Sequence, residues 1–228
     1  MNWHILSSDF FDRDAQIVAQ ALLGKVLAHQ VGDLWLQARI VETEAYYLQD
    51  RASHASLGYT PKRKSLFMPP GTIYMYYARG GDSFNISTQG AGNAVLVKGA
   101  MPYQPLAEED AEPPDELERG LAAMAANNPL PGGRPRPLHR LCAGQTLLCR
   151  ALGLKVPHWD GLPLPQPTLL FRDTGYTPRH ILCTTRLGIP SGRDGHLPYR
   201  FVDADFTQSA TKAPSPRSLH KSTMTPLP

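Results

Sequence analysis

The feature that most constrains the fold is the alternating segment LWLQARIVETEAYY at residues 34–47. The preceding Gly32-Asp33 pair suits a tight hairpin turn, so antiparallel strands are expected on both sides of it, across residues 25–47. Alternation places Glu42 and Glu44 on a face that begins apolar. One interpretation is a solvated strand end. The other places at least one glutamate at the rim of a core, in a setting suited to a base.

Further segments indicate short strands joined by turns, with helices beside them. Strands are expected at 72–78, 93–99, 168–172 and 181–189, and helices at 9–24, 116–127 and 139–153. Asp9 or Asp12 is the expected cap of the first helix. Because several strands follow one another without a helix between them, the pattern favours an antiparallel sheet over a βαβ series. The expected fold class is mixed α/β (α+β), in a single domain.

Composition shifts suggest how the chain is divided. Residues 107–137 are acidic and proline-rich and are expected to form a surface insert, and residues 157–167 a proline-rich coil. The predicted domain spans residues 1–206, and residues 207–228 form a basic tail without periodicity, predicted to be disordered.

The charge distribution limits which partners the chain can bind. The formal net charge is +3, and no acid follows Asp205. Lys212, Arg217 and Lys221 therefore account for the whole net charge, and residues 1–211 sum to zero. This excludes a general basic coat for nucleic acid, so any contact with DNA by the body of the protein must come from local patches.

A set of side chains in the first half of the chain is suited to a ligand pocket. Its members are Glu44, Tyr46, His54, Tyr74, Tyr76, Asn85 and Lys98. An acid, a histidine, several aromatics and an amide can stack a flat heterocycle and read its polar edge. Composition alone also allows a purely structural role for these residues. Tyrosines in strands often only pack, and a single histidine is often a hydrogen-bonded polar residue without a catalytic role.

The order of these residues resembles the alkyladenine (3-methyladenine, methylpurine) DNA glycosylase family. The matching blocks are VETEAY, a following S-H, a T-P with a basic cluster, F-x-x-P-G-x-x-Y-x-Y, N-I-S, NAVLVKGAMP, LCAGQTLLCRALGL, RLGIP and LPYRF. The resemblance covers about residues 5–202. It implies a curved, mainly antiparallel sheet with peripheral helices, and an enzyme that removes damaged purines from DNA.

The resemblance also implies a partner, and the sequence itself indicates a location. The expected partner is double-stranded DNA that carries a damaged purine, with no metal and no organic cofactor. A monomer is the default state for an enzyme that scans DNA. No apolar run approaches the roughly 18 residues that a membrane helix needs, and the N-terminus lacks the pattern of a signal peptide. We therefore expect no membrane association, and a cytoplasmic, nucleoid-associated location.

Residue roles follow from the resemblance position by position. Glu44 matches the general base that activates water, and Tyr46, His54 and Tyr76 match the residues that sandwich an extruded base. His54 could also donate a hydrogen bond to the lesion or a phosphate. Asn85 matches a residue that crowds the purine 2-position and would clash with the exocyclic amine of guanine.

Two positions depart from the family pattern. Lys98 stands where relatives usually carry arginine. Its cation could orient Glu44 or contact phosphate, and a Schiff-base lyase activity is a second interpretation. Arg79 falls where relatives insert an aromatic wedge into the duplex. It could fill the gap itself, with Tyr77 as the alternative wedge, or simply contact a phosphate.

The run Lys62, Arg63 and Lys64 is the third feature expected to meet DNA. A charge run is often only a solvated loop. Its closeness in sequence to the pocket residues favours contact with DNA.

Three functions remain open from the sequence. The first is a monofunctional glycosylase that excises alkylated or deaminated purines with Glu44 as base. The second is a catalytically silent protein that binds DNA lesions. The third is a nucleoside or sugar hydrolase using Glu42 and Glu44, because two strand residues apart means about 7 Å, within the spacing of inverting glycosidases. The family resemblance makes Glu42 structural instead, paired with Arg39, Lys25 or another buried cation.

Overall fold

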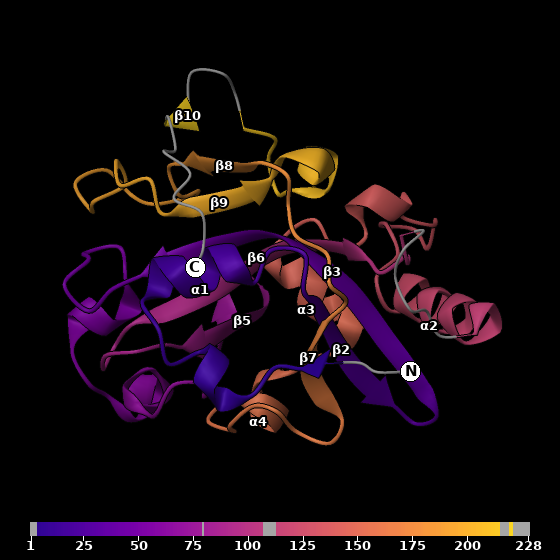
Figure 1. The fold of residues 1–228 in the computed structure, drawn as a ribbon, viewed down its shortest axis with the longest axis horizontal. Coiled ribbons are helices and arrows are strands. Elements are labelled where there is room, and N and C mark those ends of the chain that lie inside the picture. The colour runs from indigo at the N-terminus through magenta and orange to yellow at the C-terminus, as the bar shows by residue number, and fades with distance from the viewer. Residues whose placement is uncertain (1–3, 79, 107–112, 215–218, 221–228) are drawn as a thin grey trace.

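The fold is built on one antiparallel sheet (Figure 1). The computed structural model describes residues 4–78, 80–106, 113–214 and 219–220. Its ten strands are β1 His4–Ile5, β2 Val26–Val31, β3 Leu34–Tyr46, β4 Ile73–Ala78, β5 Gly81–Ser87, β6 Ala94–Pro102, β7 Leu169–Asp173, β8 Ile181–Thr184, β9 Arg200–Asp203 and β10 Leu219–His220. The main path runs β1-β7-β2-β3-β6-β5-β4, while β9 joins β3 to β8 and β10 pairs with β8. The predicted mixed α/β class with an antiparallel sheet is confirmed.

Helices cover the sheet from both sides. They are α1 Ala15–Ala21, α2 Pro114–Asn127, α3 Gln145–Leu152 and α4 Val156–Trp159, with 3-10 helices at Ser8–Phe10, His54–Leu57, Pro61–Phe67, Leu138–Arg140 and Ala204–Ser209. Figure 1 shows α1 in front of the sheet and α3 behind it. Helix α1 contacts β3 and β6, and α3 contacts β5, β6 and α2. No helix in the described ranges is long and apolar enough to cross a membrane.

The first helix begins later than the sequence pattern predicts. The carboxylate of Asp14 accepts the backbone N–H of Gln16 at 2.8 Å, so Asp14 caps α1 in place of the expected Asp9 or Asp12. Just after the helix, Gly24 has a φ of +85°, and a Cβ there would collide with the ring of Tyr176. Glycine is required at this turn on both counts.

Strand β3 is the centre of the fold and carries both glutamates. It pairs with β6 along one edge, and along the other with β2 and then, over residues 42–44, with β9. The register with β6 shifts between Ile40 and Thr43. Both faces of the strand are buried over most of its length, because helices lie on each side, and the Thr43 hydroxyl donates to the Ala19 carbonyl of α1 at 2.7 Å. The alternation had indicated a face suited to burial, but the second face is covered as well.

Part of the predicted insert 107–137 belongs to the packed domain. Helix α2 contacts β3 and α3, and its Gly120 and Met124 are buried. The fully buried Asn128 amide donates to the Leu141 carbonyl at 2.7 Å. The acidic residues 107–112 lie outside the described ranges.

The packed chain also continues beyond the predicted boundary at residue 206. Residues 208–212, which we call the strap, are held through their backbone. Arg140 donates to the carbonyls of Gln208 and Ala210 at 3.2 and 2.9 Å. Beyond the strap, the predicted tail is described only at residues 213–214 and at β10.

Candidate active site

The predicted pocket residues converge on one cavity of about 500 Å³, a size typical of small-molecule sites. The cavity lies between strands β3 to β6 and the 3-10 helix His54–Leu57, which carry these residues, and residues 143–147 around the start of α3, the loop at 187–193 and Thr211 of the strap. Six of the seven predicted side chains line it, namely Tyr46, His54, Tyr74, Tyr76, Asn85 and Lys98. The seventh, Glu44, lies immediately behind this lining, because it bonds directly to three residues of the wall.

The Glu44 carboxylate is fully buried and held by three donors. Its Oε1 accepts the backbone N–H of Leu187 at 3.0 Å, and its Oε2 accepts the Tyr46 hydroxyl at 2.7 Å and the Lys98 ammonium at 3.4 Å. A carboxylate can accept about four hydrogen bonds. The group is therefore fixed in position and still has capacity for a further donor such as water.

The surroundings of Tyr46, whose hydroxyl donates to Glu44, keep its phenol protonated. Burial and the neighbouring Glu44 charge hold the pKa of Tyr46 well above its ordinary value. The hydroxyl therefore remains a donor at neutral pH, and the Tyr46 ring stays beside the cavity as a flat, uncharged surface.

His54, Tyr74 and Tyr76 form an aromatic cluster on the cavity wall. The ring centres of His54 and Tyr76 are 4.4 Å apart, and those of Tyr74 and Tyr76 are 5.5 Å apart in a stacked arrangement. His54 Nδ1 lies 3.0 Å from the Tyr74 hydroxyl. Partial burial and the nearby Arg63 guanidinium lower the pKa of His54 below its ordinary value, so the imidazole is uncharged at neutral pH.

Asn85 is nearly buried and fixed by the strand beside it. Its side-chain amide donates to the Tyr74 carbonyl at 3.0 Å. Asn85 on β5 lies opposite Tyr74 on β4, so the register of these two strands determines the position of the Asn85 amide in the cavity wall.

The residues predicted to meet DNA have different surroundings. Lys62 and Lys64 are exposed on the 3-10 helix Pro61–Phe67. Arg63 is half-buried and donates to the His54 carbonyl at 3.1 Å, so it supports the pocket loop. Tyr77, at the end of β4, is 67% exposed. The Arg79 prediction lies outside the described residues.

Glu42 has a different environment from Glu44. It is fully buried, its Oε1 accepts Arg200 Nε at 2.6 Å, and its Oε2 accepts the backbone N–H of Thr211 at 2.6 Å. Glu42 is not among the residues that line the cavity. The buried cation paired with it is thus Arg200, whereas Lys25 pairs with Asp173 at 2.7 Å.

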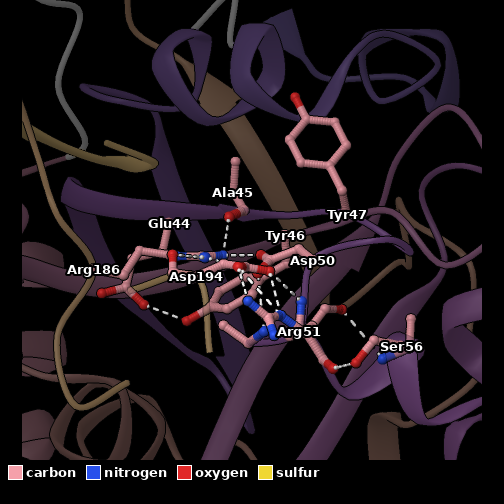
Figure 2. Close-up of polar contacts among 12 residues, drawn as sticks. Glu44, Ala45, Tyr46, Tyr47, Asp50, Arg51, Ser56, Arg186 and Asp194 are labelled. Atoms are coloured by element: carbon pink, nitrogen blue, oxygen red, sulfur yellow. Dashed lines mark hydrogen bonds and ion pairs between the residues drawn. The ribbon is translucent and has the colours of Figure 1, made fainter. Parts of the chain in front are cut away.

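Sequence reasoning gave no role to three residues that shape the site. Arg186 and Leu187 adjoin Glu44 and Tyr46, and Thr211 lines the cavity (Figure 2 shows Arg186). The signal for the first two was present, since both belong to the RLGIP block. Thr211 falls in the segment that composition predicts as tail. Within the described ranges, no group of three or more His, Cys, Asp or Glu residues could hold a metal ion.

The fold and cavity define a class of protein that can enclose a flat ring beside a fixed, buried carboxylate. The sequence model of the family described as methylpurine-DNA glycosylase matches residues 9–207. The chain belongs to this family of DNA glycosylases, which are hydrolases of N-glycosyl bonds. The resemblance found in the sequence blocks is thereby confirmed.

Individual relatives agree with the family match. A provisionally named 3-methyladenine DNA glycosylase of Pseudomonas fluorescens is 60% identical over 209 residues, covering 92% of this chain and 87% of the relative. A relative of the same provisional name from Pseudomonas aeruginosa is 56% identical, covering 92% and 84%. The mouse DNA-3-methyladenine glycosylase is 34% identical over 205 residues, covering 86% of this chain and 58% of the mouse protein.

Proposed function

We propose that this chain extrudes alkylated or deaminated purines from duplex DNA and hydrolyses the bond between the base and its deoxyribose, with Glu44 activating the water. The observation that carries the proposal is the position of Glu44. A buried carboxylate lies directly behind an aromatic-lined cavity and is oriented by Leu187, Tyr46 and Lys98. Such a reaction is the first step of base excision repair.

In the proposed reaction, the water oxygen attacks C1′ of the extruded nucleotide while Glu44 takes its proton. The bond between C1′ and the purine nitrogen breaks, and its electron pair leaves with the base. The transition state resembles an oxocarbenium ion, so the Glu44 anion also stabilises it. An alkylated purine is already cationic and leaves readily, whereas a neutral deaminated purine needs a proton on departure.

The damaged base is proposed to bind between the ring of Tyr46 on one side and the rings of His54 and Tyr76 on the other. Stacking contributes about 1–3 kcal/mol per base, and attraction to the ring faces favours a positively charged base. The lowered pKa of His54 supports this role, because an uncharged imidazole does not repel a cationic purine.

Lys98 is proposed to act as a positioning cation. A Schiff base forms when the amine itself attacks C1′, but the Lys98 nitrogen is held 3.4 Å from the buried Glu44 carboxylate in an ion pair. We therefore propose a monofunctional enzyme that leaves an abasic site without cutting the strand.

Contacts with the duplex are proposed at the exposed Lys62 and Lys64 and at the end of β4. Ammonium groups at the first two positions can pair with phosphates in a salt-sensitive way. Tyr77 is exposed enough to enter the base stack, and Arg79 remains the alternative. A monomer acting at the nucleoid completes the proposal.

The test of this function is an excision assay on labelled duplexes that contain 3-methyladenine, ethenoadenine, hypoxanthine or an alkylated guanine. We expect strand breaks at the lesion only after alkali or heat, because the direct product is an abasic site. Breaks that form without alkali would assign lyase chemistry to the enzyme. Tight binding of these duplexes with no base release over hours would establish the silent lesion binder instead.

Asn85→Ala is expected to relax discrimination against guanine. Removing the amide frees space at the cavity wall, and the purine 2-amino group then meets no obstruction there. We expect release of undamaged guanine to rise at least about tenfold, since one lost steric or polar contact changes discrimination by roughly 1–3 kcal/mol. Chromatography of bases freed from unmodified and alkylated DNA measures this, and release of alkylated adenine should change little.

Asn93→Ala is the control for this substitution, since Asn93 is not part of the cavity wall. Equal guanine release by wild type and Asn85→Ala would contradict the role of Asn85.

A further inference from the structure

Arg186 is a buried cation to which the proposed reaction assigns no role. It follows β8 and is 4% exposed. Both terminal nitrogens bind the carboxylate of Asp50, which is itself 5% exposed, with Nη2 and Oδ1 3.0 Å apart. Nη1 also donates to the Ala45 carbonyl at 3.0 Å. Burial alone would lower the pKa of Arg186, but Asp50 offsets this and leaves the pKa raised. The guanidinium is therefore charged and fixed at several points.

The guanidinium is also in contact with the residues that hold Glu44. Its central carbon lies 4.5 Å from the centre of the Tyr46 ring, and Tyr46 donates its hydroxyl to Glu44 (Figure 2). The next residue along the chain, Leu187, donates its backbone N–H to the other oxygen of Glu44. Two of the three donors that hold the carboxylate are thus adjacent to Arg186.

We propose that the ion pair of Arg186 and Asp50 is a positioning element for the reaction, which sets Tyr46 and Leu187 and through them the Glu44 carboxylate. This inference rests on the proposed role of Glu44. The ion pair joins two parts of the chain, because Asp50 follows β3 whereas Arg186 directly precedes the cavity-lining loop at 187–193.

The choice of an arginine supports positioning over mere stability. A buried ion pair contributes little to stability compared with well-packed apolar residues. A planar guanidinium, however, grips a carboxylate with two parallel hydrogen bonds and stacks on an aromatic ring, which fixes an orientation that lysine cannot reproduce. Displacing reacting groups by about 1 Å can cost 100-fold in rate, so such a fixed orientation affects the rate directly.

The test is Arg186→Lys, which keeps a cation beside Asp50 but removes the two-pronged grip and the planar stack. We expect the single-turnover rate of base release at saturating enzyme, corrected for the active fraction, to fall about 10- to 100-fold. The dissociation constant for lesion duplex should change much less than the rate. Arg179→Lys is the matched control. Arg179 also grips an aspartate, Asp205, through two nitrogens, but it is 79% exposed and should keep the wild-type rate.

A double-mutant comparison tests the route through Tyr46. If Arg186 acts through the Tyr46 hydroxyl and Glu44, Arg186→Lys combined with Tyr46→Phe should be no more than about threefold slower than the slower single variant, because residues that act as one unit have non-additive effects. Losses that multiply fully would overturn the route. Should Arg186→Lys fail to fold, Asp50→Asn, which keeps the shape of the partner, should show the same fall in rate with duplex binding retained.

The result for Glu44→Gln separates this inference from the proposed function. If Glu44→Gln stops excision while Arg186→Lys and Asp50→Asn keep the wild-type rate, the positioning role is wrong and the proposed function stands. If Glu44→Gln keeps excising bases, the proposed function fails and the positioning role fails with it.

Discussion

Glu44→Gln is expected to abolish base release while binding of a lesion duplex persists. A glutamine cannot take a proton from water, and general base catalysis typically contributes a factor of about 10²–10⁴. The cavity wall of Tyr46, His54 and Tyr76 remains in the variant, so stacking of an extruded base should be retained. Single-turnover excision and an equilibrium binding measurement on the same lesion duplex check the two parts of this expectation.

The stability of the variant must be measured beside its activity. A neutral amide at this position would leave the Lys98 ammonium without its carboxylate partner in a nearly buried site, which costs stability. Thermal unfolding therefore defines a temperature at which both proteins are folded, and excision is compared there. Base release by Glu44→Gln within about tenfold of wild type, well short of the loss expected for a missing general base, would remove Glu44 from the reaction.

Glu42→Ala is expected to give the opposite result, a large loss of stability with chemistry retained. It leaves the buried Arg200 guanidinium without its carboxylate partner and the Thr211 N–H without its acceptor. Breaking a buried ion pair in this way lowers the free energy of unfolding by about 3–5 kcal/mol. For a protein of this size, that lowers the midpoint temperature of thermal unfolding by roughly 6–20 °C. Calorimetry or thermal melting monitored by circular dichroism measures the shift.

A surface acid provides the control for this experiment. Glu116 lies exposed on α2, and Glu116→Ala should change the free energy of unfolding by less than about 0.5 kcal/mol. Below its lowered midpoint, Glu42→Ala should still release bases. If it were folded with an unchanged midpoint but inactive, Glu42 and Glu44 would have to act together, as in a two-carboxylate hydrolase.

The sequence predicted those parts of the site that depend on local patterns. Alternation and a hairpin turn located β2 and β3, and the order of the blocks located Glu44, Tyr46 and the tyrosines of β4. These are periodic or contiguous features, so a single stretch of chain contains the whole signal. The predicted start of α1 was wrong because several aspartates nearby can each cap a helix. Packing in the folded protein selects which of them does so.

Contacts between distant residues could not be predicted in this way. Glu42 meets Arg200 across 158 positions, Glu44 meets Leu187 across 143, and Asp50 meets Arg186 across 136. Nothing in one sequence states which of its arginines will face a given acid, since the choice depends on how the sheet brings β9 and the loop after β8 to β3. The role of Glu42 was therefore left open, and the pairing of Arg186 was not foreseen.

The strap has a consequence for the order in which the protein is made. One wall residue of the cavity, Thr211, and the backbone groups that bind Arg140, Arg200 and Glu42 are translated after the strands they join. A nascent polypeptide that has reached only β9 contains Glu42 and Arg200, but residues 211 and 212, which supply a backbone partner to each, have not yet been added. The cavity wall is thus complete only after the strands around it have been made, and Thr211 is added together with the backbone groups that bind Glu42 and Arg200.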